Sequence, residues 1–154
     1  MIVFVVMLVS IAAARGIGAL GWDVLADWQV ATRVGLAVMF VFTGLAHFGR
    51  TRTDLIRMVP PWMPRPALVV ALTGFAELAG AVGLLVPPLA RPTAVALIAL
   101  LVAMFPANVH ATRAGRTLAG RPPTPLALRL PMQALWVGLL WWSTWMARGE
   151  DLIF

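Results

Sequence analysis

Apolar residues run along this chain in five long blocks, and short polar stretches separate the blocks. None of the blocks alternates apolar and polar residues, as a half-buried strand would. Each approaches the roughly 17–25 residues that a helix needs to cross about 30 Å of hydrocarbon. In lipid a helix satisfies its own backbone hydrogen bonds. The pattern therefore predicts an all-α bundle of five spanning helices, over residues 1–20, 28–48, 66–86, 92–109 and 126–147.

The first block has a second interpretation, as a secretory signal, because Ala12, Ala13 and Ala14 form a small-residue cleavage pattern. Such signals normally begin with basic residues. Here the first basic residue is Arg15, which follows the apolar run. We therefore expect a retained spanning helix and keep cleavage as the alternative.

Composition decides between a soluble core and a bilayer. Hydrophobic residues make up 61% of the 154 and charged residues 12%, with a mean hydropathy of +0.90. A soluble domain carries about 25% charged residues, so these numbers indicate an integral membrane protein. The absence of cysteine excludes disulfides, thiolate metal ligands and a Cys-x-x-Cys redox pair.

All basic residues are arginines, and they predict an orientation. The formal net charge is +6, but the arginines flank apolar blocks, which favours lipid headgroups over nucleic acid as their partners. Five spans place the second and fourth connections on the side of the N-terminus. The positive-inside rule then puts the N-terminus in the cytoplasm of a bacterial inner membrane and the C-terminus outside. The arginines assigned to the inner side are Arg50, Arg52, Arg57, Arg65, Arg113, Arg116, Arg121 and Arg129; the outer side has Arg15, Arg33, Arg91 and Arg148 beside Asp23, Asp27, Glu150 and Asp151.

Glu77 is a carboxylic acid inside an otherwise apolar or small-residue run. It lies about 16 Å into its predicted helix at roughly 1.5 Å per residue. Intramembrane ionisable groups face the bundle interior and are usually functional. Its neighbours at helical spacing include Thr73, Gly74 and Gly80, which either admit another helix or leave a cavity. Glu77 is therefore either a ligand or proton site, or a neutral acid that hydrogen-bonds two helices together.

Other polar groups are expected near Glu77 in the cytoplasmic half of the bundle. Thr43, Gly44 and His47 lie on the second predicted helix, where Arg33 holds the outer end. In the fourth, Pro106 removes a backbone donor and bends the helix before Asn108. These residues predict one polar cluster, completed by Gln133 and Arg129 from the fifth helix. No catalytic motif occurs, and the two histidines do not predict a metal site.

Several stretches resemble the DoxX-like family of small bacterial membrane proteins. They are RVGLAVMFVFTGLAHF, MVPPWMPRP, LTGFAELAGAVGLLVP and FPANVHATRAG. The resemblance implies a four-helix core, to which residues 1–20 add an N-terminal helix. It marks Arg33, His47, Glu77, Pro106 and Asn108 as recurring features. Some members are small subunits of thiosulfate:quinone oxidoreductases, so it also implies a redox-accessory role.

These observations lead to a functional expectation. We expect a lipophilic, quinone-like molecule or a bound lipid in the polar cluster, with His47 and Asn108 hydrogen-bonding it and Glu77 holding a proton. The alternatives are a non-catalytic structural subunit of a membrane oxidoreductase complex and a proton-coupled transporter. The expected partners are the lipid bilayer and either a redox membrane protein or a second copy of the chain, without nucleic acid.

Overall fold

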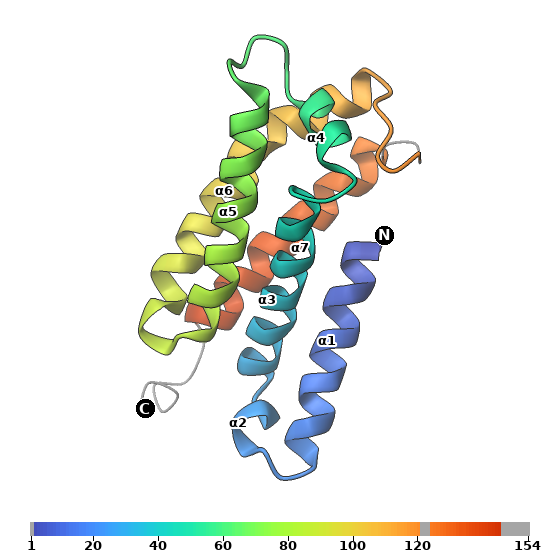
Figure 1. Ribbon diagram of the computed structural model, residues 1–154. Helices are drawn as coiled ribbons and strands as arrows, with labels where there is room; N and C mark the ends of the chain where they lie inside the picture. The colour runs from blue at the N-terminus through green and yellow to red at the C-terminus, as the bar shows by residue number, and fades with distance from the viewer. Residues whose placement is uncertain (1, 121–123, 146–154) are drawn as a thin grey trace.

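A computed structural model describes residues 2–120 and 124–145, and helices dominate this part of the chain (Figure 1). It contains no strand element, which confirms the all-α prediction. Arg121, Arg148, Glu150, Asp151 and the last two residues of the fifth predicted span lie outside the described residues. The helices are α1 (Ile2–Ala19), α2 (Asp23–Ala26), α3 (Trp28–Ala46), α4 (Arg52–Met58), α5 (Pro66–Leu85), α6 (Pro87–Arg113) and α7 (Leu126–Trp145).

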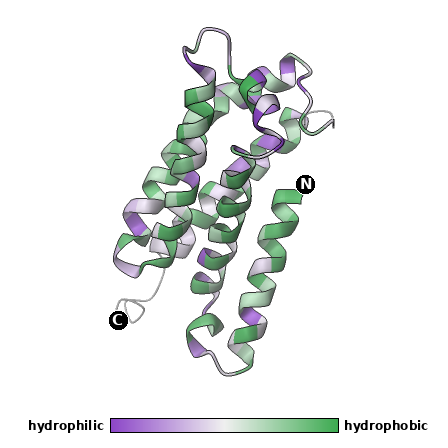
Figure 2. Ribbon diagram, in the orientation of Figure 1, coloured by the Kyte–Doolittle hydropathy of each residue, from purple (hydrophilic) through white to green (hydrophobic). Residues whose placement is uncertain are grey.

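Four of these helices, α1, α3, α5 and α6, are long and apolar enough to cross a membrane, with mean hydropathies between 1.5 and 2.2. Their outward faces carry large apolar side chains; on α5, Phe75 is 61% and Val82 64% exposed. Figure 2 shows green along most of the long helices, whereas purple gathers at α4. A water-soluble fold would bury such side chains, so the chain is a membrane protein.

The fifth predicted span forms α7, a helix of 20 residues, but α7 is not among the four that reach the hydropathy of a span. Arg129, Gln133 and several tryptophans lower its average. Arg129 and Gln133 both donate hydrogen bonds to α6.

Successive long helices run in alternating directions and pack on their neighbours (Figure 1). The contacts pair α1 with α3, α3 with α5, α5 with α6, and α7 with both α3 and α6. As a result α4 and the connection between α6 and α7 lie at one end of the bundle, which we call the α4 end. The α1–α3 connection and the short α5–α6 turn lie at the other end.

The core between the long helices is made of tightly packed aliphatic and aromatic side chains. Leu36 and Phe40 of α3 meet Ala81 and Leu84 of α5, with Leu97 and Leu140 completing the cluster from α6 and α7. Close helix packing here uses glycine: a Cβ on Gly80 would collide with Leu97. Small residues let helix backbones approach, which stabilises contacts that the hydrophobic effect cannot drive in lipid.

Helix α6 is longer than predicted, because it begins at Pro87 and ends at Arg113. Proline is favoured in the first turn of a helix, where its missing N–H has no intrahelical partner. The predicted span 92–109 lies inside this longer helix, and Pro92 and Pro106 are both interior residues.

Candidate functional site

A buried acid–imidazole pair lies where the end of α3 meets the middle of α5. Glu77 is 4% and His47 5% exposed. His47 Nδ1 lies 3.7 Å from Glu77 Oε2, which is too long for a hydrogen bond, and 2.9 Å from the carbonyl oxygen of Thr43. His47 Nδ1 therefore donates to its own helix, and the carboxyl oxygen beside it receives no hydrogen bond from the ring.

Glu77 Oε2 is a buried polar atom without a hydrogen-bond partner in the described part of the chain. The hydroxyl of Thr43, on the facing helix, donates within α3 to the carbonyl oxygens of Met39 and Phe40, at 3.2 and 3.3 Å. A buried polar group left unsatisfied costs about 1–3 kcal/mol. Such a group is unusual in a native structure and requires an explanation, either a bound water or ion or a functional role.

Glycines bring α3 and α5 together around this pair. A Cβ on Gly74 would lie 2.6 Å from His47 Cβ, and one on Gly44 would lie 2.9 Å from the side chain of Leu78. The hydroxyl of Thr73 donates to its own helix, at the carbonyl oxygens of Val69 and Val70. Of the two roles that the sequence leaves open for the small residues, the structure shows close helix approach.

The pair is nearer to a helix end than the sequence suggests. His47 packs on Gly74, and the eight residues of α5 before Gly74 extend past the end of α3 toward α4 (Figure 1). At about 1.5 Å per residue this overhang is about 12 Å. Glu77 therefore lies only one turn from the end of α3, although it is well inside α5.

A second polar group joins α6 to α7. Arg129 Nη1 donates to Asn108 Oδ1 at 2.5 Å, and its Nε donates to the carbonyl oxygen of Thr124 at 3.2 Å. Gln133 Nε2 donates to the carbonyl oxygen of Leu101 at 2.7 Å. Leu101 precedes Val102, whose carbonyl would meet the N–H that Pro106 lacks. Gln133 thus stabilises α6 beside its proline.

The two groups share a level of the bundle but remain distinct. Gly80 of α5 packs on Leu97 of α6. Because the two helices are antiparallel, Glu77 and Leu101 each lie one turn from this contact toward the α4 end, and so they are at the same level. Because Gln133 bonds to Leu101, it lies at this level too. Within residues 2–120 and 124–145, no hydrogen bond or ion pair joins the two groups. The residues expected to form one cluster therefore form two groups. The His47–Glu77 group has a buried oxygen without a hydrogen-bond partner in the described residues, whereas Asn108, Arg129 and Gln133 have protein partners.

Trp136 was not singled out from the sequence. Its Nε1 is the other buried side-chain atom without a partner in the described residues. The spacing offered a signal, since Trp136 follows Gln133 by three residues and precedes Leu140 by four, which places all three on one helix face. Trp22, Trp28, Trp62 and Trp141 are instead half to two-thirds exposed, as interfacial anchors are.

The remaining residues have structural positions. Arg33 is buried near the start of α3, and Arg91 Nε donates to the carbonyl oxygen of Thr144 at 3.1 Å, tying α6 to α7. Among the described residues no three His, Asp or Glu side chains gather as metal ligands would.

The architecture defines an all-helical membrane protein with a buried acid–imidazole pair. Its sequence from Leu36, in α3, to residue 147 matches the family described as Domain of unknown function (DUF8561), and the chain belongs to that family. Residues before Leu36, including α1 and α2, lie outside the match. No curated protein and no solved structure matches the chain.

The family match shows that the resemblance to DoxX-like proteins is wrong. The stretches that carried it are glycine-rich helices and proline-rich connections. Any small membrane bundle uses glycine where helices approach closely and proline where helices begin, so such motifs do not separate one family from another.

Proposed function

We propose that this protein binds a lipophilic small molecule with a quinone-like head within its helix bundle. The observation that carries the proposal is Glu77 Oε2, a buried carboxyl oxygen without a hydrogen-bond partner in the described residues. A ligand with a donor or acceptor group supplies the missing partner, and a lipophilic ligand reaches the site from the bilayer.

The chemistry of the pair suits a head that exists in two hydrogen-bonding forms. A protonated Glu77 donates to a quinone carbonyl, whereas an ionised Glu77 accepts from a quinol hydroxyl. His47 Nδ1 is engaged by the Thr43 carbonyl, so the second ring nitrogen is the one that serves a ligand. Asn108, Arg129 and Gln133 already have protein partners and therefore act as helix connectors in this proposal.

The role proposed is binding and release, accessory to a redox system that supplies the quinone. The topology belongs to the same proposal: five spans, with α7 as the fifth, in a bacterial inner membrane and with the α4 end in the cytoplasm. The arginines at the α4 end support this orientation through the positive-inside rule. Glu77 and His47 then lie in the cytoplasmic half of the bundle.

A ligand-induced stability shift tests the proposal. Purified protein is titrated with a short-chain benzoquinone and its quinol, and the unfolding temperature is followed. We expect a rise that saturates, since a ligand that binds only the folded state stabilises it. Glu77→Met should abolish the rise. The matched control is Ser143→Ala, because Ser143 is fully buried and bonds only within α7.

Two results would overturn the proposal. One is a wild-type unfolding temperature that neither form of the probe changes. The other is a rise that is equal in wild type and in Glu77→Met, which would place the probe elsewhere on the protein.

A further inference from the structure

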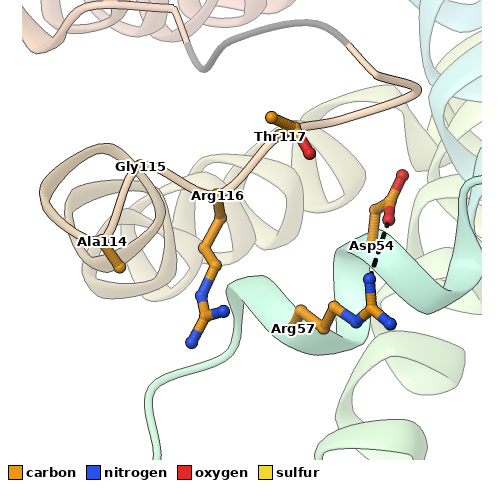
Figure 3. A pocket seen from close by; sticks show the side chains of 6 residues that line it. All are labelled: Asp54, Arg57, Ala114, Gly115, Arg116 and Thr117. Carbon is orange, nitrogen blue, oxygen red and sulfur yellow. Dashed lines mark ion pairs between the residues drawn. The ribbon is translucent and has the colours of Figure 1, made fainter.

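A polar pocket lies on the surface at the α4 end of the bundle (Figure 3). It has a volume of about 160 Å³ and lies between α4 and the segment that follows α6. At roughly 30 Å³ per water in the liquid, it has room for a small polyatomic anion. The lining residues are Asp54, Arg57, Ala114, Gly115, Arg116 and Thr117.

Two interactions hold the walls of this pocket together. Helix α6 ends in a Schellman turn: Gly115 has φ 60°, and Arg116 N donates to the carbonyl oxygen of Ala111 at 2.9 Å. The chain then crosses α4, where Ala119 N donates to Asp54 Oδ2 at 3.0 Å. In this turn the carbonyl oxygens of His110, Ala111 and Thr112 accept hydrogen bonds, which reduces the negative charge at this end of α6.

The charge of the pocket is positive. Asp54 is engaged by the Ala119 N–H and by Arg57, whose Nη1 lies 3.9 Å from Asp54 Oδ1. Arg116 enters from the opposite wall, and its side chain has no hydrogen bond or ion pair within the described part of the chain (Figure 3). Asp54 is the only acidic side chain that the described residues place at this end, against Arg50, Arg52, Arg57, Arg65, Arg113 and Arg116.

We propose that this pocket binds a phosphate group carried by an anionic phospholipid. The Arg116 guanidinium offers the paired N–H donors that match phosphate oxygens. The Thr117 hydroxyl also lines the pocket, but it points away from that guanidinium (Figure 3). A lipid is the favoured source because the pocket lies at one end of a bundle whose long helices are apolar enough to cross a membrane. Free phosphate shares the chemistry and is distinguished by experiment.

Native mass spectrometry of the detergent-solubilised full chain tests the site. The probes are short-chain phosphatidylglycerol, short-chain phosphatidylcholine and inorganic phosphate. We expect phosphatidylglycerol to bind most tightly. Arg116→Gln, which keeps the backbone N–H of the Schellman turn, should weaken it roughly fivefold, as for an exposed charge contact. Asp54→Asn, which retains an acceptor for Ala119, should tighten it.

Arg52→Gln is the matched control, since it removes one exposed arginine of α4 that does not line the pocket. It should leave phosphatidylglycerol binding unchanged. An equal loss in Arg52→Gln and Arg116→Gln would overturn the site in favour of a diffuse charge effect. Tighter binding of inorganic phosphate than of phosphatidylglycerol would overturn the lipid assignment. Neither result bears on the quinone experiment, which concerns another part of the bundle.

Discussion

His47 and Gly74 face each other where α3 and α5 cross, and no room remains between them for a side chain on α5. A Cβ built on Gly74 would lie 2.6 Å from His47 Cβ and 2.9 Å from the ring of Phe48. Since His47 Cβ is fixed by its backbone, relief requires the helices to move apart. Together with Gly44, Gly74 therefore allows the short distance between α3 and α5 at the level of the candidate site.

Replacing Gly74 by alanine should destabilise the bundle. Overpacking a tight contact costs about 1–3 kcal/mol, and this exceeds the 0.5–1 kcal/mol that alanine gains over glycine inside a helix. Reversible unfolding in mixed micelles measures the difference. Gly138→Ala is the control, because a Cβ there meets nothing within 4 Å; it should be neutral or stabilising. Equal effects of the two substitutions would contradict the close contact.

Replacing Glu77 by methionine should stabilise the ligand-free protein. The substitution removes a buried oxygen that has no partner in the described residues, and such an atom costs about 1–3 kcal/mol. Unfolding of ligand-free protein in mixed micelles measures the change. If Glu77 instead locks two helices by a hydrogen bond, the same substitution should destabilise by about 1–2 kcal/mol. Stabilisation by the substitution therefore indicates a binding site, whereas destabilisation indicates a structural acid.

The sequence predicts the helices of this protein better than their relative positions. Apolar blocks specify long helices directly, because the length of each block and the cost of an exposed backbone in lipid leave few alternatives. The offset between α3 and α5 depends instead on how His47 packs against Gly74. For this reason, counting residues along α5 alone predicts a deep position for Glu77. The structure instead shows Glu77 one turn from the end of α3.

For the candidate site, too, the sequence predicts which residues take part but not how they are arranged. Sequence reasoning identifies Glu77 and His47, whose side chains lie together, and Asn108 and Arg129, which bond to each other. It does not reveal that these are separate groups, since that depends on which face each helix turns to its neighbours. Nor does it anticipate the contact between Asp54 and Ala119, which are 65 residues apart.

Gln133 and Trp136 should differ in how much stability is lost when their polar group is removed. Gln133→Leu removes a 2.7 Å hydrogen bond to the carbonyl oxygen of Leu101 and should destabilise by about 0.6–1.7 kcal/mol. Trp136→Phe removes an N–H without a partner in the described residues, so the cost of its smaller ring is offset. The same unfolding assay compares them. A larger loss in Trp136→Phe than in Gln133→Leu would contradict the hydrogen-bond pattern.

The proposed orientation predicts opposite accessibility for two matched tryptophans. Trp22, between α1 and α2, and Trp62, between α4 and α5, are each 69% exposed, and they lie at opposite ends of the bundle. The chain has no cysteine, so Trp22→Cys or Trp62→Cys introduces a single thiol. In intact cells a membrane-impermeant maleimide should label the Trp22→Cys protein alone, and after permeabilisation it should label both. If only the Trp62→Cys protein is labelled in intact cells, the orientation is opposite to the one proposed. Glu77 and the Arg116 pocket then lie in the outer half of the membrane.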